Sequence, residues 1–326
     1  MGSNNKGIAH GVGSDSITIH LKNMAHIYIF SPSSAVRDKA AFRRGVKRLQ
    51  AQGNQVEVDE AALASHMRFA GDDATRITAI TRAAASGADV ALISRGGYGL
   101  TRILPALPYK QIAKAIDGGT QFVGLSDFTA FNQAVLAKTG RISWQGPALG
   151  EDFGPSQEPD DIMLACFEDL LLEQGEGTGW QLPKPEAERR VLVKDAPLWG
   201  GNLAVLTSLL GTPYFPQVKG GVLFLEDVGE HPYRIERMLT QLLHAGVLAQ
   251  QKAVLIGQFT NYKLVPAHDK GFKLATVVEW LRSQIKAPVL TGLPFGHVET
   301  KVLLPVGAKV DLVTEGRDAL MVWGHI

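Results

Sequence analysis

The chain has 326 residues, of which 45% are hydrophobic and 20% charged, and this length favours two globular domains over one. The 33 basic and 32 acidic residues leave a net charge of +1, which argues against a nucleic-acid-binding surface or a charged tail. The single cysteine, Cys166, excludes an intramolecular disulfide framework and a multi-cysteine zinc site.

The first 23 residues lack the apolar segment of a signal peptide, and we interpret residues 1–23 as an N-terminal extension or an expression remnant. The fold is expected to begin near Met24. The longest uncharged stretch, 196–218, contains several prolines and glycines. It therefore predicts a buried helix with flanking loops, and we expect no membrane partner.

From residue 26 onward, the pattern predicts alternating strands and helices. Strands are expected at 27–30, 55–58, 88–94 and 121–125, and helices at 37–51, from Asp72 or Asp73 to Gly87, and at 127–138. Short buried strands that alternate with helices are typical of a parallel sheet covered on both faces. The fold class is therefore α/β in the first domain, 24–173.

Residues 174–188 are rich in glycine, proline and charged residues, and we interpret them as a linker. The second domain, 189–326, is predicted to be mixed α+β. Its strands are expected at 221–225, 253–258, 301–304, 309–313 and 320–323, with an amphipathic helix at 234–244.

Two loops in the first domain follow strands, where α/β proteins commonly bind ligands. The first, 95–99, reads Arg-Gly-Gly-Tyr-Gly. Its glycines allow a backbone to approach a ligand and to point N–H groups at an anion, although a tight turn alone would also explain them. It fits neither the dinucleotide fingerprint nor the P-loop.

The second loop, Gly-Leu-Ser-Asp at 124–127, places Ser126 between a strand and a helix N-terminus. There the hydroxyl is exposed as in a nucleophile elbow, and the first N–H groups of the helix, including that of Asp127, face developing negative charge. A second interpretation is that Ser126 merely caps the helix.

A serine nucleophile needs a base and an orienting acid. His297 follows the rigid Gly-Leu-Pro-Phe-Gly turn at 292–296, and Glu226 follows a predicted strand. An exposed loop histidine is the alternative for His297. Glu230 and His231 suggest a metal, but no second cluster with ligand spacing accompanies them, so no metal or other cofactor is expected.

Five segments together resemble the LD-carboxypeptidases, a family of serine peptidases also called muramoyltetrapeptide carboxypeptidases. These segments are 95–99, 124–127, Gly-Gly-Asn-Leu at 200–203, Leu-Glu-Asp-Val-Gly-Glu at 225–230, and 292–297. They occur in the family's order, and the resemblance extends from about Ala25 to the end of the chain. It implies a Rossmann-like N-terminal domain with the serine, a C-terminal domain with the glutamate and histidine, and a homodimer.

The resemblance implies that Ser126 is the nucleophile, His297 the general base and Glu226 the residue that orients it. It also implies an oxyanion hole formed by the backbone N–H groups of Asp127 and of a glycine, for which Gly97 is our choice.

Further candidates concern substrate binding. A carboxypeptidase needs a cation for the terminal carboxylate, and we predict Arg102, with Arg95 as the second choice. Tyr98 and Asn202 are further candidates for substrate contact.

The resemblance indicates a cytoplasmic enzyme that removes terminal D-alanine from murein tetrapeptides during cell-wall recycling. The alternative is a peptidase like the microcin C self-immunity proteins, which cleave peptidyl- or aminoacyl-nucleotide amides. These proteins have an aromatic residue that holds the base of the nucleotide. Trp180 in the predicted linker leaves this open. A third hypothesis is a two-lobed protein that binds a small ligand without catalysis.

Overall fold

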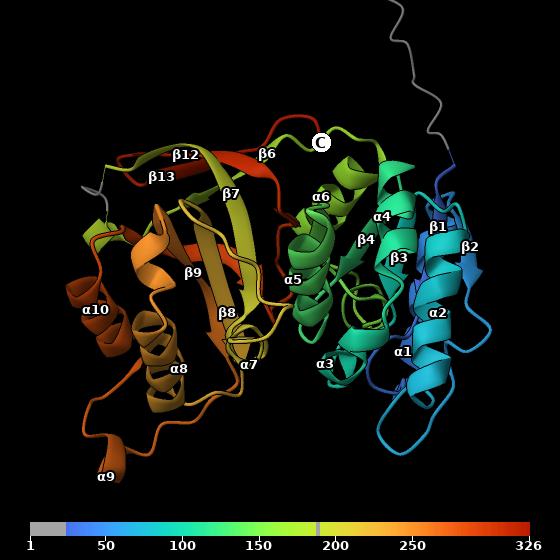
Figure 1. Ribbon diagram of the computed structural model, residues 1–326, viewed down its shortest axis with the longest axis horizontal. Coiled ribbons are helices and arrows are strands. Elements are labelled where there is room, and N and C mark those ends of the chain that lie inside the picture. Colours follow the sequence, from blue (N-terminus) through green and yellow to red (C-terminus); the bar gives the residue numbers. More distant parts are fainter. Residues whose placement is uncertain (1–23, 187–189) are drawn as a thin grey trace, which may run out of the picture.

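The computed structural model describes residues 24–186 and 190–326, so the predicted extension lies outside the described residues. Two β-sheets stand side by side, with helices between and around them (Figure 1). The predicted α/β class, with a parallel sheet in the first half and a mixed second half, is confirmed. Within the described ranges, none of the helices combines the length and apolar character that a bilayer-spanning helix needs.

The first sheet contains six strands in the order β11-β5-β4-β3-β1-β2. Five of them run parallel, and β11 joins the edge antiparallel to β5. The bounds are β1 His26–Phe30, β2 Gln55–Val58, β3 Val90–Ile93, β4 Gln121–Gly124, β5 Ser143–Gln145 and β11 Leu304–Val306. All four side chains of β3 are buried, as expected for a central strand covered on both faces.

The second sheet contains seven strands in the order β10-β9-β8-β7-β12-β13-β6. Strands β7 to β10 are parallel, whereas β12, β13 and β6 extend the sheet antiparallel. The bounds are β6 Gly177–Gln181, β7 Leu192–Asn202, β8 Val222–Val228, β9 Ala253–Thr260, β10 Val289–Gly296, β12 Lys309–Glu315 and β13 Asp318–Val322.

Several sequence-based assignments differ from the structure. The segment 196–218, predicted as a buried helix with flanking loops, begins with the end of strand β7 and contains only the short helix α7, Leu203–Ser208. The predicted linker 174–188 contains β6, whose backbone pairs with β13 and so belongs to the second sheet. The strand predicted at 301–304 instead spans Leu304–Val306 and joins the first sheet. Chain order therefore does not divide the two sheets cleanly, because a C-terminal strand completes the N-terminal sheet.

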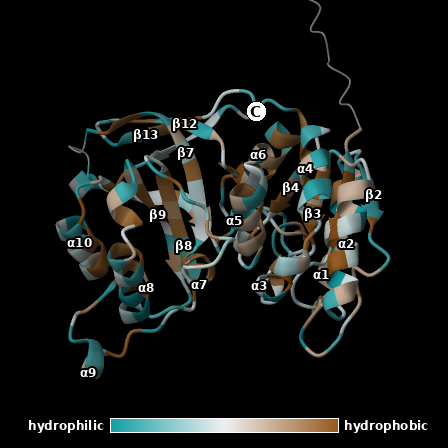
Figure 2. Ribbon diagram, in the orientation of Figure 1, coloured by the Kyte–Doolittle hydropathy of each residue, from teal (hydrophilic) through white to brown (hydrophobic). Residues whose placement is uncertain are grey.

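Ten α-helices flank the sheets within the described residues. Their bounds are α1 Lys39–Ala51, α2 Asp73–Ala85, α3 Leu100–Ile103, α4 Tyr109–Asp117, α5 Phe128–Thr139, α6 Asp161–Leu171, α7 Leu203–Ser208, α8 Pro232–His244, α9 Pro266–Asp269 and α10 Leu274–Gln284. Strands β8 and β9 are mainly hydrophobic, whereas the peripheral α9 is hydrophilic (Figure 2).

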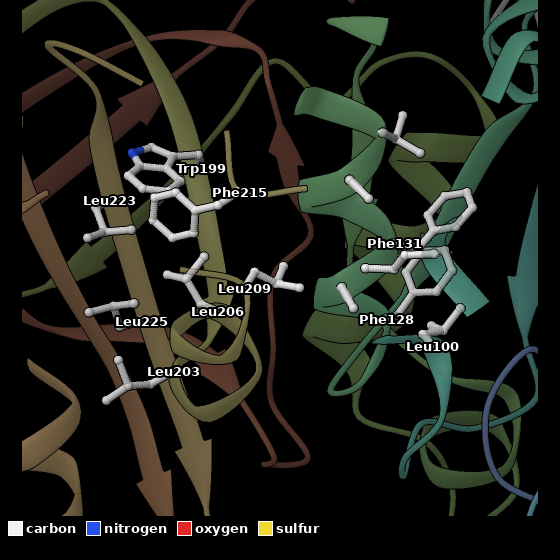
Figure 3. Packing of buried hydrophobic residues seen from close by; sticks show 14 of the residues in the cluster. Leu100, Phe128, Phe131, Trp199, Leu203, Leu206, Leu209, Phe215, Leu223 and Leu225 are labelled. Carbon is white, nitrogen blue, oxygen red and sulfur yellow. The ribbon is translucent and has the colours of Figure 1, made fainter. Parts of the chain in front are cut away.

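Helix α5 lies between the two sheets and contacts α7 and β7 (Figure 1). Its Phe128 and Phe131 stack with ring centroids 4.6 Å apart. One hydrophobic cluster continues from these rings to Leu206 on α7 and to Trp199 and Leu225 on the second sheet (Figure 3). This shared core holds together the two halves that carry the predicted nucleophile and base.

Candidate active site

Ser126 lies in the sharp turn between β4 and α5. Its backbone has a φ of +66°, a left-handed conformation that costs a non-glycine residue energy and is often found at functional sites. Asp127 occupies the N-cap position of α5, without a side-chain capping bond. The capping interpretation of Ser126 therefore fails, and the strained turn has the geometry of a nucleophile elbow.

The glycine turn after β3 packs directly against this elbow. A Cβ placed on Gly96 would lie 2.7 Å from Cβ of Ser126 and 3.0 Å from the carbonyl oxygen of Leu125. The buried carboxylate of Asp127 joins the two loops, because it accepts hydrogen bonds from the Leu100 N–H at 2.9 Å and from Oγ of Ser33 at 2.8 Å. Only glycine permits this approach at position 96.

Two backbone donors predicted to bind an oxyanion belong to these two turns. Gly97 has a φ of +107°, and Asp127 opens helix α5. Among the hydrogen bonds of residues 24–186 and 190–326, none engages the N–H of Gly97 or that of Asp127. Both groups therefore keep a donor for a ligand, and their place in an oxyanion hole stays a prediction.

His297 and Glu226 form a close pair at the ends of two strands of the second sheet. Nδ1 of His297 lies 2.7 Å from Oε2 of Glu226. The Glu226 side chain is fully buried, and that of His297 is 16% exposed. With Nδ1 bound to a carboxylate, Nε2 is left to exchange a proton with substrate.

Asn202, at the end of β7, connects this pair to the serine helix. Its Nδ2 donates to Oε1 of Glu226 at 3.2 Å and to Oδ1 of Asp227 at 2.9 Å. Its backbone N–H donates to Oγ1 of Thr129, in the first turn of α5, at 3.0 Å. A continuous set of hydrogen bonds thus runs from the helix of Ser126 to the carboxylate that holds His297.

Burial and charge set the protonation of these groups. Burial by itself lowers the pKa of His297, but the hydrogen bond and negative charge of Glu226 outweigh it, and the pKa is raised overall. Burial, followed by the charge of Glu226, raises the pKa of Asp227 to about 6. Glu226 thus stabilises the imidazolium that forms when His297 accepts a proton.

A pocket of about 540 Å³ opens beside His297. Leu125, which precedes Ser126, lies in its wall. The charged residues around it are Glu151, Asp152, Glu299 and Lys301. The pocket therefore adjoins both the predicted base and the elbow, as a substrate site must.

The predicted substrate-binding residues lie elsewhere or have other partners. Arg102 is bound to Asp73, with Nε 2.8 Å from Oδ2, on the surface of α3. Arg95 donates to the carbonyl oxygen of Ala35 at 3.2 Å. Arg102 is thus held by an exposed ion pair, whereas Nε of Arg95 is buried without a hydrogen-bond partner among the described residues, and a clamp role for either arginine stays a prediction.

Tyr98 and Asn202, the other two residues predicted to contact substrate, have different surroundings. The ring of Tyr98 is exposed and packs near Phe69, with centroids 5.9 Å apart. Asn202 is buried, and both hydrogens of its amide are engaged by Glu226 and Asp227, while Oδ1 accepts from the Val205 N–H. Asn202 therefore positions the acid rather than contacting substrate.

Two other sequence observations can be placed. Trp180 is buried in β6, and its Nε1 donates to the carbonyl oxygen of Thr291 at 3.2 Å. It therefore has a structural partner in the second sheet. Across the described residues, no group of three or more His, Cys, Asp or Glu side chains is arranged to hold a metal ion.

Both halves of the chain match the domains of one known family. Residues 27–146 match the LD-carboxypeptidase N-terminal domain, and residues 195–312 match the LD-carboxypeptidase C-terminal domain. The chain is 31% identical, over 84% of its length and 84% of the relative, to a Bacillus subtilis protein named "Probable murein peptide carboxypeptidase". It is 30% identical over 65% of its length to the murein tetrapeptide carboxypeptidase of Pseudomonas aeruginosa, of which it covers 68%.

Solved structures with a similar fold include members of the same family. The muramoyltetrapeptide carboxypeptidase from Oxalobacter formigenes has a TM-score of 0.82 and 37% identity, covering 92% of this chain and 98% of that one. The microcin C7 self-immunity protein, at 23% identity and a TM-score of 0.80, shares the fold over 93% of this chain and 97% of its own. With both domains matched and the predicted motifs gathered at one site, the chain belongs to the LD-carboxypeptidase family of peptidases.

Proposed function

We propose that the protein is a serine carboxypeptidase that removes the terminal D-alanine from murein tetrapeptides. The observation that carries this proposal is the buried Glu226–His297 pair at 2.7 Å, linked through Asn202 and Thr129 to the helix that follows the strained Ser126. The names of the relatives from Pseudomonas aeruginosa and Oxalobacter formigenes support the substrate class.

The proposed mechanism begins when His297 accepts the proton of Ser126 as Oγ attacks the amide carbonyl carbon. The N–H groups of Asp127 and Gly97 stabilise the oxyanion, and each such donor contributes about 3–4 kcal/mol to lowering the barrier. His297 then protonates the amine of D-alanine as the C–N bond breaks. Water, activated by the same histidine, hydrolyses the ester on Ser126.

Mass spectrometry of a murein tetrapeptide incubated with wild-type protein, Ser126→Ala and Ser208→Ala tests this proposal. Ser208 is an exposed serine on α7 and serves as the matched control. We expect loss of one alanine with wild type and Ser208→Ala, and a rate lower by at least about 10⁴-fold with Ser126→Ala. Equal cleavage by all three proteins would refute the serine mechanism.

The same experiment addresses the alternatives. If wild type leaves the tetrapeptide intact but hydrolyses an aminoacyl-nucleotide amide, the microcin-immunity activity replaces our proposal. Since Trp180 is buried against Thr291, the aromatic residue that kept this alternative open does not favour it. A non-catalytic binding protein would cleave neither compound, and its ligand affinity would survive Ser126→Ala.

Two further points rest on the family resemblance. We propose a cytoplasmic location and a homodimer. Light scattering of the purified chain tests the second, and fractionation of cells that produce it tests the first.

A further inference from the structure

The proposed chemistry restricts where the terminal carboxylate of the substrate can lie. His297 must reach the leaving nitrogen within hydrogen-bond distance, roughly 3 Å. In the leaving residue, the carboxylate carbon is about 2.5 Å from that nitrogen, since only the N–Cα and Cα–C bonds separate them. A cation that recognises this carboxylate must therefore border the pocket beside His297.

Among the described residues that line this pocket, Lys301 has the one basic side chain besides His297. Arg102 is instead paired with Asp73, and Arg95 donates to Ala35; neither lines the pocket. Of the other charged residues of the wall, Asp152 is paired with Lys301, and Glu151 and Glu299 repel a carboxylate. The ammonium of Lys301 and the repulsion from the two glutamates together direct an anionic group toward Lys301.

The ammonium of Lys301 is held firmly, yet it retains donors. Its side chain is 3% exposed, and Nζ lies 2.5 Å from Oδ1 of Asp152. A lysine ammonium has three N–H groups, and the contacts found among the described residues account for one of them. Two donors therefore remain for a ligand oxygen.

Both partners of this pair are themselves fixed. Oδ2 of Asp152 accepts from the Ala148 N–H at 2.7 Å, within a π-helical turn, Leu149–Phe153, of a kind often found at functional sites. Next to Lys301, Oγ1 of Thr300 donates to Asp160 at 2.5 Å. The cation is therefore positioned before substrate arrives, which lowers the entropy cost of binding.

We infer that Lys301, oriented by Asp152, binds the terminal carboxylate of the peptide and makes the enzyme a carboxypeptidase. This inference rests on the proposed function. It predicts that the enzyme distinguishes a peptide that ends in D-alanine from the same peptide that ends in D-alaninamide, because the amide lacks the negative charge.

The test compares kcat/KM for a murein tetrapeptide and its C-terminal amide in wild type, Lys301→Met and Lys309→Met. Lys309 forms a comparable ion pair with Asp195, but both side chains are exposed, so it is the matched control. The positive charge of Lys301 also lowers the pKa of His297. Rates are therefore compared at about pH 8.5, where an imidazole is largely neutral.

Lys301→Met is expected to lower kcat/KM for the acid by about 10- to 100-fold, the usual range for a hydrogen bond to a charged group. The rate for the amide should change by less than about threefold, so that discrimination is lost. Lys309→Met should retain wild-type discrimination. Because Lys301→Met leaves the buried Asp152 unpaired, the double variant Asp152→Asn/Lys301→Met removes both charges and provides a second measurement if the single variant does not fold.

If the Lys301 variants lose kcat/KM equally for the acid and the amide, Lys301 has only a structural role, and the inference is overturned. If Arg102→Met loses the discrimination between acid and amide, the inference is likewise overturned, because Arg102 would then bind the terminal carboxylate. A wild-type enzyme that cleaves acid and amide equally contradicts the inference alone. One that cleaves neither contradicts the proposed function and the inference together.

Discussion

Oε2 of Glu226 lies 2.7 Å from Nδ1 of His297, and this carboxylate is fully buried. A buried carboxylate needs hydrogen-bond donors, and here they are the imidazole of His297 and the amide of Asn202. The three residues come from the ends of β7 and β8 and from the residue after β10. Strands from the parallel part of the second sheet thus position the base.

Asn202→Ser tests the positioning role of the asparagine. Serine retains the ability to cap α7 but cannot bridge Glu226 and Asp227. We expect kcat to fall by about 10- to 100-fold with little change in KM, since the substrate contacts stay intact. The free energy of unfolding should fall by about 1–3 kcal/mol. An increase in KM at unchanged kcat would instead indicate direct contact with substrate.

The pH dependence tests the electrostatic role of Glu226. His297 acts as a base only when it is neutral, so kcat/KM should rise with pH as the imidazolium loses its proton. Because Glu226 raises the pKa of His297, the midpoint of this rise should lie above about 6.5, the ordinary pKa of histidine. Glu226→Gln removes the charge that favours the imidazolium. The limb should therefore move to lower pH, and the maximal rate should fall by roughly 10³- to 10⁴-fold.

The measurement is a pH profile of kcat/KM for wild type and variant. Glu151 and Lys301 also act on His297, the first raising and the second lowering its pKa, and both remain in Glu226→Gln. An acid limb that stays in place would show that Glu226 does not control this proton.

Gly96→Ala tests the contact between the glycine turn and the elbow. The added Cβ would lie 2.7 Å from Cβ of Ser126, so the turn or the serine must move. We expect activity to fall by about 100-fold, because small displacements at a reacting group are costly, and stability to fall by about 1–3 kcal/mol.

Gly118→Ala provides the matched control, because its φ is −90° and the nearest atoms to an added Cβ are 3.4 Å away. It should retain full activity in the same peptide assay. If Gly96→Ala also kept wild-type activity and melting temperature, the close packing of the two loops would not matter for catalysis.

Local sequence patterns sufficed for the strands β1 to β4 of the first sheet and for the placement of the key residues at strand ends. The buried run in β3, the glycine turn that follows it and the serine turn before α5 each depend on a few neighbouring residues. Glu226 and His297 could be singled out for the same reason, because each is part of, or next to, a recognisable strand or turn.

Contacts between distant residues were not predictable in this way. Asp152 and Lys301 are 149 residues apart, and nothing near either one indicates its partner. The same holds for β11, which returns to the first sheet, and for β6, whose glycine-rich sequence resembles a linker until it pairs with β13. For Arg102, local spacing suggested a role, but neither its ion pair with Asp73 nor its absence from the pocket beside His297 could be predicted from that spacing.

The sequence by itself therefore determined the family, the α/β class and the identity of the candidate triad, because these depend on short motifs and on local hydrophobic patterns. The tertiary structure decided which polar groups have partners. Asn202 is inferred to be a positioning residue because its buried amide is bonded to Glu226 and Asp227, and Lys301 is the candidate cation because it borders the pocket with donors to spare. Both depend on which distant residues the packing of the whole chain brings together.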